Sequence, residues 1–435
     1  MKVSRGWLAF ALALALIAGI LSACDFQFPG ELLPSGNAGT TPTATIALTA
    51  TAEPTVPATA TPAGPQTLKL WLPPQFDPAA GTPAGNLLKT RLAEFTTRMP
   101  NVQIEIRIKD IEGPGGLLDM LGTASAAAHK ALPDLVILPS EQLETAALQG
   151  WLYSFDNLST QLDDPDWFSF AREMARVQKN TFGMPFAADA LVQVYHPDAI
   201  PEPARDFAGI LSGKLPFVFT AADPQAAFAH ALYLDAGGAV RDEQGKPALD
   251  ALKLEEVLVF FQEANSSGVF PYWLSSLQAD DQSWQAFQDD RTDQVATWVS
   301  RYLGSGGEAD ALAPVPTRNG TPISVGSGWA WALTSPEPSH HPASVQLVEF
   351  LTESDFLSGW TEALGLLPTR PSALQAWRNT RQAGELLPVA ESLRLYPPQE
   401  ILDSLGKALE KATVDVLKEQ AGPKEAAQAA VENFK

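Results

Sequence analysis

Alternating apolar and polar residues predict the first strands of the chain. Leu68, Leu70 and Leu72 recur at every second position, which predicts a strand. Residues 102–108 alternate strictly between apolar and polar side chains, which indicates a second strand with one wet face. The uninterrupted apolar run at 135–138 is typical of a strand that is buried on both faces.

Helices are predicted where apolar residues recur three or four positions apart. Leu88, Leu92 and Phe95 occupy one face of a helix that Pro100 brings to an end. Further helices are expected at residues 117–121, 141–149, 170–177, 224–235, 252–264, 342–353, 355–364, 399–419 and 423–433. Further strands are expected at residues 190–195, 215–220, 294–299 and 323–333.

This order of elements predicts an α/β fold. Strand, helix, strand, helix and strand in succession imply right-handed crossovers and a mostly parallel sheet. Ligands of such sheets bind at the carboxyl ends of the strands. Those ends fall at residues 73–77 and 139–142, where we expect a binding site.

The N-terminal apolar segment has the pattern of an export signal. Lys2 and Arg5 precede an uncharged apolar run at 8–20, which is shorter than the ~20 residues that cross a bilayer as a helix. Leu-Ser-Ala-Cys follows at 21–24, and Cys24 is the only cysteine of the chain. This ending resembles the lipobox of bacterial lipoproteins. The resemblance implies that residues 1–23 are a signal peptide and that Cys24 carries a lipid anchor to the cell membrane, on its extracytoplasmic side. The alternative is a secreted protein with an unused cysteine beside the cleavage site.

A segment rich in Pro, Thr and Ala follows the predicted anchor. Residues 34–65 contain almost no large apolar side chain, so nothing in them offsets the entropy lost on ordering. We therefore interpret residues 24–65 as a lipid-anchored, disordered linker and residues 66–435 as the folded domain. A flexible chain of this length spans roughly 30 Å and would hold the domain off the membrane.

Composition limits the classes of function. The 435 residues are 45% hydrophobic and 18% charged, which supports one large two-lobed domain or two ordinary ones. The net charge of −21 becomes −23 when Lys2 and Arg5 leave with the signal peptide. Such a chain repels phosphate backbones, so we expect no nucleic-acid partner. With one cysteine no disulfide can form within the chain, so stability must come from the core.

Several motifs in register carry a resemblance to a known family over about residues 66–435. They are the strand, helix and strand at 68–108, Pro-Asp-Leu-Val at 133–136, Leu-Gln-Gly-Trp-Leu-Tyr-Ser-Phe at 148–155, Phe-Gly-Met-Pro at 182–185 with the strand at 191–195, Val-Gly-Ser-Gly-Trp at 325–329, and Leu-Leu-Pro-Thr-Arg at 366–370. The chain resembles the extracellular solute-binding proteins of ABC importers, specifically family 1, the large sugar-binding group. It departs from the family pattern at residues 287–295, at His196 and at residues 298–302.

The resemblance implies a two-lobed periplasmic-binding-protein-like fold (type II). Each lobe would be a mostly parallel sheet flanked by helices, with lobe 1 at about 66–188 and 296–329 and lobe 2 at 190–295 and 333–435. Hinge closure would trap a sugar or oligosaccharide in the cleft between the lobes and deliver it to the permease subunits of an ABC transporter. The resemblance implies neither a cofactor nor an enzymatic activity.

The chain is rich in the groups that bind sugars. Planar rings cover the C–H faces of pyranoses, and carboxylates and amides bind vicinal hydroxyls. The chain contains 11 Trp, so rings are plentiful. The candidate ligand-binding residues are Trp71, Glu141, Asp189, Trp273, Trp329, Trp331 and Arg370, with Trp298 and Arg301 as weaker candidates.

The aromatic candidates also have a structural interpretation. Trp71 ends the first predicted strand, where a core position is an equal alternative. Trp329 and Trp331 lie two positions apart in a predicted strand, so they share one face. Trp273 follows Tyr272 in a predicted loop and could pack inside a lobe instead.

The charged candidates have alternatives as well. Glu141 follows a buried strand and matches an acid that the family uses for hydroxyls, but its charge also suits a helix N-terminus. Asp189 lies at the predicted crossing between the lobes, where the family often places an acid. Arg370 matches the Leu-Pro-x-Arg segment, and a surface ion pair is its alternative.

Other chemistries fit the sequence less well. His340 and His341 lack the spacing and companion ligands of a metal site, and the acids at 289–293 lack the calcium-loop pattern. Walker and Gly-x-Ser-x-Gly motifs are missing. Two alternatives stay open: a binder of a cationic solute such as a polyamine, and a cell-surface glycosidase that uses a pair of carboxylates.

Overall fold

The computed structural model describes residues 65–306 and 309–434. The predicted signal peptide, Cys24 and residues 24–64 of the predicted linker lie outside the described residues. None of the described helices is both long enough and apolar enough to span a bilayer.

The first lobe is built on a mixed sheet. Its strands lie in the order β10-β6-β9-β3-β1-β2, of which β2, β1 and β3 are parallel and the others antiparallel to their neighbours. The bounds are β1 Gln66–Leu72, β2 Val102–Ile108, β3 Leu135–Pro139, β6 Gly183–Tyr195, β9 Ser324–Leu333 and β10 Leu367–Pro368. β3 is buried along its whole length, as its continuous apolar run predicts.

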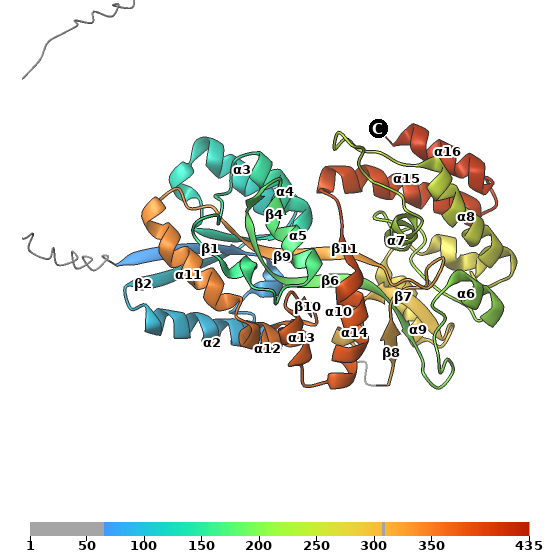
Figure 1. Cartoon of the computed structure of the whole chain (residues 1–435), viewed down its shortest axis with the longest axis horizontal. Coiled ribbons are helices and arrows are strands. Elements are labelled where there is room, and N and C mark those ends of the chain that lie inside the picture. Colours follow the sequence, from blue (N-terminus) through green and yellow to red (C-terminus); the bar gives the residue numbers. More distant parts are fainter. Residues whose placement is uncertain (1–64, 307–308, 435) are drawn as a thin grey trace, which may run out of the picture. The chain divides into compact units, whose positions relative to one another are not determined.

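Helices cover both faces of this sheet (Figure 1). They are α2 Pro83–Arg98, α3 Leu117–Ala127, α4 Ser140–Leu148, α5 Ser169–Ala175, α11 His341–Leu351, α12 Ser354–Leu364 and α13 Pro371–Gln375. The α2 helix buries the predicted face of Leu88, Leu92 and Phe95. Thr82 caps its first turn by accepting a hydrogen bond from the Gly85 amide at 3.0 Å.

The second lobe surrounds the C-terminal half of β6. This half pairs with β7 Gln294–Trp298 and β8 Ala311–Ala313, both antiparallel. Its helices are α6 Phe207–Gly213, α7 Ala227–Asp235, α8 Ala251–Ser266, α9 Asp280–Gln288, α10 Val299–Gly304, α15 Gln399–Leu417 and α16 Pro423–Asn433. A cluster of buried phenylalanines, including Phe219, Phe261 and Phe270, fills the space between them.

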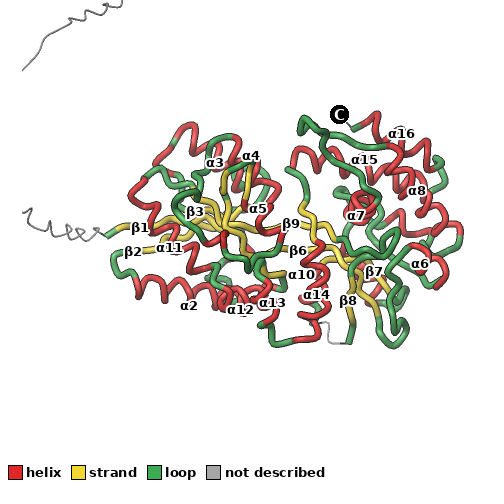
Figure 2. Tube along the Cα trace, viewed as in Figure 1, coloured by secondary structure: helices red, strands yellow, loops and turns green. Residues whose placement is uncertain are grey.

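Three segments connect the lobes. β6 and β9 run antiparallel through both lobes, and Figure 2 shows them as one continuous band of strand. The third is β11 Leu393–Leu395 and the chain after it, which pairs with the start of β9. The helix before it, α14 Thr380–Ser392, packs against β8, β6 and α13. The two remaining strands, β4 Arg176–Val177 and β5 Asn180–Thr181, form a separate antiparallel pair.

Two sequence predictions about the lobes need correction. The sheet is not mostly parallel in each lobe, because a strand that leaves a lobe and a strand that returns to it must run in opposite directions. The chain from 333 onward does not stay in lobe 2 either: α11 and α12 pack against α2 in the first lobe. The reason is that Leu333, the end of β9, pairs with Leu135 inside the first lobe, so the chain continues there. By contrast, β7, α10 and β8 within 296–329 belong to the second lobe.

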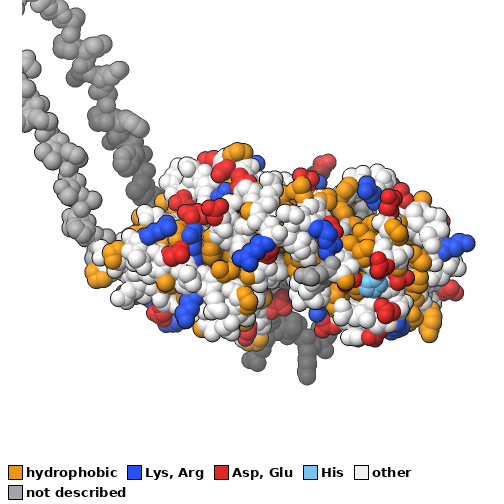
Figure 3. Space-filling view, turned by 90° about the horizontal axis from the view of Figure 1, so that it is seen from below, with side chains coloured by type: hydrophobic (Ala, Val, Ile, Leu, Met, Phe, Trp, Pro, Cys, Tyr) orange, Lys and Arg blue, Asp and Glu red, His pale blue; other side chains and the backbone are white. Residues whose placement is uncertain are grey.

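Most other elements match the prediction, with one exception. The predicted strand at 215–220 is reduced to a single bridge between Val218 and Val295. On the face shown in Figure 3, acidic and basic side chains are interspersed over both lobes.

Candidate functional site

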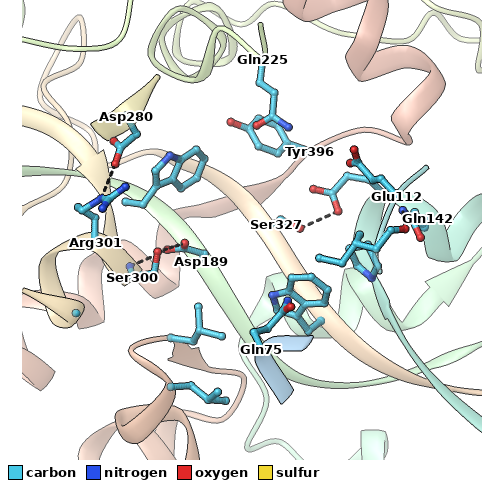
Figure 4. Close-up of a pocket in the computed structure, with 18 of the residues that line it drawn as sticks. Gln75, Glu112, Gln142, Asp189, Gln225, Asp280, Ser300, Arg301, Ser327 and Tyr396 are labelled. Carbon is cyan, nitrogen blue, oxygen red and sulfur yellow. Dashed lines mark hydrogen bonds and ion pairs between the residues drawn. The ribbon is translucent and has the colours of Figure 1, made fainter. Parts of the chain in front are cut away.

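A cleft of about 810 Å³ lies between the two lobes. Both lobes and the connecting strands contribute to it, and Figure 4 shows most of its side chains. The lining residues are Gln75, Ile111, Glu112, Pro139, Glu141, Gln142, Asp189, Gln225, Asp280, Trp284, Trp298, Ser300, Arg301, Gly304, Ser305, Ser327, Trp329, Leu364, Leu366, Tyr396 and Gln399.

The first-lobe wall comes from the carboxyl ends of its parallel strands. Gln75 follows β1, Glu112 follows β2, and Glu141 follows β3 at the start of α4. The Gln142 side chain donates to the carbonyl of Ile111 at 3.1 Å, so α4 holds the loop that carries Glu112. This is the edge at which parallel sheets bind ligands, and it is where the sequence predicts a site.

Asp189 and Ser327 form the floor where β6 and β9 cross. The two residues are direct partners in the antiparallel register. The Ser327 hydroxyl donates to Glu141 in the first lobe at 2.7 Å. The Asp189 carboxylate accepts from Ser300 in the second lobe, from its amide at 3.0 Å and from its hydroxyl. The crossing strands are therefore hydrogen-bonded to the first lobe through Ser327 and Glu141, and to the second lobe through Asp189 and Ser300.

Glu141 is a buried carboxylate that lines the cleft. Its Oε2 accepts from Ser140 at 3.1 Å and from Ser327 at 2.7 Å, and the residue is only 6% exposed. Burial raises the pKa of Glu141 above its usual value, although these hydrogen bonds oppose the shift. The amide of Glu141 itself also lowers this pKa by hydrogen bonding to the carboxylate, and the carboxylate lines the cleft, where a ligand donor can reach it.

The carboxylate of Asp189 accepts more hydrogen bonds from other residues than that of Glu141. Its Oδ1 also accepts from the Ala190 amide at 2.9 Å. Burial raises the pKa of Asp189 to about 6, and the negative charge of Asp280 adds to the shift. Asp189 therefore titrates in a range where most carboxylates are already ionised.

The second-lobe wall carries an ion pair. Asp280, the first residue of α9, accepts from Thr297 at 2.7 Å and from Nε of Arg301 at 3.0 Å. A second nitrogen of Arg301 contacts Asp281. Burial raises the pKa of Asp280, while the Thr297 and Arg301 contacts lower it. Arg301 is thus already neutralised by its own lobe.

Aromatic rings line both walls. Trp329 is half-buried and packs edge-on against Phe76, with centroids 5.2 Å apart. Trp298 is half-buried on the opposite lobe and meets the Tyr396 ring edge-on at 6.3 Å. Trp284 lies deeper, 7% exposed. Flat apolar faces thus accompany acids on both sides of the cleft.

Polar contacts join the lobes beside the cleft. Arg241, in the loop between α7 and α8, forms a bidentate pair with Glu144 of α4, with all three distances at 3.0 Å. The Thr145 hydroxyl on α4 donates to Glu400 of α15 at 3.0 Å. These contacts hold α4 against the second lobe.

The structure brings three of the candidates named from sequence into the cleft. Glu141, Asp189 and Trp329 line it, as do the weaker candidates Trp298 and Arg301. Trp284 and Tyr396 also line it and were missed. Trp284 lies in α9, which was not predicted, and Tyr396 enters from a third connecting segment that leaves no pattern in the sequence.

Two tryptophan candidates belong to the core instead. Trp71 is 2% exposed because β1 lies between β2 and β3 with both faces covered. Trp331 does share a face with Trp329, but it lies two residues further into the lobe, where it is fully buried and 5.9 Å from the Phe186 ring.

Trp273 and Arg370 also lie outside the cleft. Trp273 is in a 3-10 turn at Tyr272–Ser276, with the Arg291 guanidinium 4.1 Å over its ring. Arg370 is buried over the ring of Trp167 at 4.0 Å, donates to the Thr352 carbonyl and pairs with two acids, Asp164 and Asp166. It is an internal ion pair rather than the predicted ligand contact.

The described residues contain no group of three or more His, Cys, Asp or Glu side chains placed to hold a metal ion. The chemistry that the cleft offers is therefore that of carboxylates, amides, hydroxyls and rings.

One family model matches more than half of the chain. The family model described as bacterial extracellular solute-binding protein matches residues 91–384. No curated protein matches the chain in sequence.

Solved structures match the fold over most of the chain. The cyclic α-maltosyl-1,6-maltose binding protein from Arthrobacter globiformis, at 15% identity, covers 85% of this chain and 98% of its own, with a TM-score of 0.70. MalE from Listeria monocytogenes in complex with maltose, at 15% identity, covers 85% and 96%, with a TM-score of 0.68. MalE from Bdellovibrio bacteriovorus bound to maltotriose, at 17% identity, covers 85% and 98%, with a TM-score of 0.61. At these identities the likeness shows the fold, and it confirms the predicted two-lobed α/β architecture.

Proposed function

This chain belongs to the bacterial extracellular solute-binding proteins, and on that premise we propose that it captures a sugar or oligosaccharide in the cleft between its lobes. The observation that carries the proposal is the combination of ring faces and acceptors on opposite walls. Trp329 and Trp298 contribute rings from the two lobes, and Glu141 contributes a carboxylate from the first-lobe wall. Rings and directional acceptors together match the apolar and hydroxyl surfaces of a pyranose. The three structural neighbours, whose names record maltose, maltotriose or a cyclic maltosyl sugar, support the same class of ligand.

Capture would proceed by closure of the lobes about the connecting strands. β6, β9 and the β11 segment are the only covalent links between the lobes within the described residues, so a change there moves one lobe against the other. A solute that contacts both walls stabilises the closed arrangement by its differential affinity for it. Release without chemical change then makes the protein a binder rather than an enzyme.

The proposal extends to delivery at the membrane. The lipobox-like ending at Cys24 supports a lipid anchor, and the Pro/Thr/Ala segment at 24–65 supports a tether. A tethered binder on the extracytoplasmic side would present its solute to the permease subunits of an ABC transporter. Metabolic labelling with a fatty-acid analogue checks the anchor: the label is expected on the wild type and absent from Cys24→Ser.

Ligand binding is tested by titration with defined sugars. Tryptophan fluorescence and calorimetry should show stoichiometric binding of at least one mono- or oligosaccharide from gluco-, galacto- and manno-series of increasing length. Saturation by spermidine with no response to any sugar would replace the proposal by the cationic-solute alternative. Chromatography of the same mixtures after long incubation should return the sugar intact, and product formation would establish a glycosidase instead.

A further inference from the structure

The cleft has an excess of acid that the protein does not balance. Its lining contains four acids, Glu112, Glu141, Asp189 and Asp280, and one base, Arg301. Arg301 is bound to Asp280 at 3.0 Å and also contacts Asp281. The cleft lining therefore differs from the surface in Figure 3, where charges of both signs are interspersed.

Glu141 is buried and Asp189 half-buried, and neither has a cationic partner in the part of the chain that the structure describes. Neither Glu141 nor Asp189 forms an ion pair with any Lys, Arg or His among residues 65–306 and 309–434. Their partners are hydroxyls and amides, from Ser140 and Ser327 for Glu141 and from Ala190 and Ser300 for Asp189. Buried charges in proteins are ordinarily paired, because removing them from water costs several kcal/mol each. Here no matching charge lies within ion-pair distance among the residues that the structure describes.

Glu112 places a third carboxylate beside Glu141. The α4 helix holds the Glu112 loop through the Gln142 to Ile111 hydrogen bond, and the charge of Glu112 contributes to the raised pKa of Glu141. Figure 4 shows Glu112 next to the carboxylate that accepts the dashed bond from Ser327. Two carboxylates at one wall repel each other unless a positive charge lies close to both.

An unpartnered hydroxyl lies at the same end of the cleft. Tyr396 is 6% exposed, and its buried hydroxyl has no hydrogen-bond partner. Its pKa is raised by burial and by the nearby charges of Asp223, Glu141 and Asp189. Figure 4 shows the Tyr396 ring above Ser327, between the two walls. A buried hydroxyl without a partner is destabilising, and a ligand donor would offset that cost.

We propose that the solute is a sugar carrying a protonated amino group, with the ammonium donating to Glu141, Glu112 and the Tyr396 hydroxyl while the pyranose stacks on the indoles. This inference rests on the proposed function and narrows its ligand class. Closure over a neutral sugar would leave three carboxylates in a cleft with little water, where their repulsion is strongest. An ammonium pairs with the Glu141 carboxylate, gives the Tyr396 hydroxyl a partner and lowers that repulsion.

Matched sugar pairs test the charge directly. In each pair, an ammonium group of the second sugar replaces a hydroxyl of the first. The pairs are glucose and glucosamine, galactose and galactosamine, mannose and mannosamine, and cellobiose and its fully deacetylated diamino counterpart. The N-acetylated sugars give a neutral control at the same carbon. By calorimetry on the full chain near pH 7, the amine of at least one pair should bind about tenfold or more tighter than its hydroxyl partner, the difference between a charged and a neutral hydrogen bond.

Salt and pH give a second readout. The amine advantage should shrink as salt rises from about 0.05 to about 0.5 M, since counterions screen the attraction. Amine affinity should rise as the pH passes through about 6, where Asp189 of the cleft ionises, while neutral sugars should show no such gain.

Variants locate the ammonium. Glu141→Gln and Glu112→Gln keep the side-chain size and should bring the amine-to-hydroxyl affinity ratio close to one. Glu94→Gln, a surface acid on α2 of the same lobe, is the control and should leave the ratio unchanged. Glu112 is exposed, so its variant tests the inference even if Glu141→Gln folds poorly.

The failures are distinguishable. If hydroxyl sugars bind as tightly as their amines, or if only neutral sugars bind, the inference is overturned and the proposed function stands. If no sugar binds, with or without an amine, both are overturned.

Discussion

At the scale of single residues, position along a strand decides which aromatic side chain reaches the cleft. Trp329 and Trp331 carry the same pattern in the sequence and lie on the same face of β9. Only Trp329 reaches the cleft, because β9 runs from the crossing into the core of the first lobe. Periodicity identifies the face of a strand, but the distance from a residue to the edge of the core depends on how other segments pack. For the same reason Glu141 and Asp189, each next to a strand end or crossing, were identified, whereas Tyr396 was not.

Removing one ring from the cleft should weaken sugar binding without unfolding the protein. Trp298→Ala removes a half-buried ring that contacts Tyr396, and we expect about a tenfold loss of affinity, since one aromatic contact contributes about 1.5 kcal/mol. Trp273→Ala is the control, because that ring lies outside the cleft under Arg291. Calorimetry with the tightest sugar measures both. Equal affinities for the wild type and Trp298→Ala would remove this residue from the site.

The carboxyl of Asp189 should make stability depend on pH. Its pKa in the folded protein is about 6, raised by burial and by Asp280, whose charge Arg301 only partly balances. As pH rises, the unfolded chain loses this proton first, so stability from this group is greatest at low pH and declines through pH 6. In Asp189→Asn this decline is absent, so its melting temperature relative to the wild type should improve from about pH 4.5 to about pH 7.5. Thermal unfolding checks this, and a difference that is constant with pH would contradict it.

At the scale of elements, strand and helix periodicity carried most of the fold. The helices at 224–235, 252–264 and 399–419 appear in the structure as α7, α8 and α15 with small changes at their ends. The periodicity of the sequence did not predict whether neighbouring strands run parallel or antiparallel. Val295 and its neighbours in β7 have the pattern of any buried strand, and only their partner β6 makes them antiparallel. The α9 helix was not predicted, although its Trp284 belongs to the cleft.

The close approach of β6 and β9 should depend on one glycine. A Cβ on Gly326 would lie 1.9 Å from the carbonyl oxygen of Asp189, which is backbone and cannot move without separating the strands. We expect Gly326→Ala to destabilise the protein by about 3 kcal/mol or more. Gly359→Ala, in the interior of α12 with no atom within 4 Å of the new Cβ, should instead stabilise by about 0.5–1 kcal/mol. Denaturant unfolding compares the two, and a neutral Gly326→Ala would show that the crossing tolerates separation.

At the scale of the whole domain, the chain crosses between the lobes three times. Each lobe is therefore made of several separate segments, and the lobe boundaries are hard to predict from the sequence. The sequence motifs located the two crossings at 182–195 and 325–329, so the two-lobed architecture was accessible. The return at residues 393–398 has no pattern of its own, because its short strand β11 pairs only with the first residues of β9. Without it, α11 and α12 were assigned to the wrong lobe. The consequence for the site is that Tyr396 and Gln399 enter the cleft from a segment that the sequence places at the far end of the second lobe.

The contacts beside the cleft should influence affinity even though they touch no ligand. Arg241 and Glu144 join the lobes through a bidentate pair whose side chains are each about one-third exposed. Glu144→Gln breaks this pair and should shift the equilibrium toward separated lobes. Part of the binding free energy of the solute is then used to close the lobes, so the observed affinity falls. A partly exposed pair of this kind contributes at most about 1 kcal/mol, so we expect up to about a fivefold loss of affinity, expressed mainly as faster dissociation.

A charge reversal separates closure from local damage. Glu144→Arg alone should weaken binding more than Glu144→Gln, because it places two positive charges together. Combined with Arg241→Glu it should recover most of the affinity, since the pair is restored in the opposite sense. Stopped-flow fluorescence measures the dissociation rates, and small-angle scattering of the solute-free protein measures the separation. If the double variant binds no better than Glu144→Arg, the pair does not control closure, and the lobes are held by the connecting strands, the cleft contacts and the Thr145–Glu400 hydrogen bond.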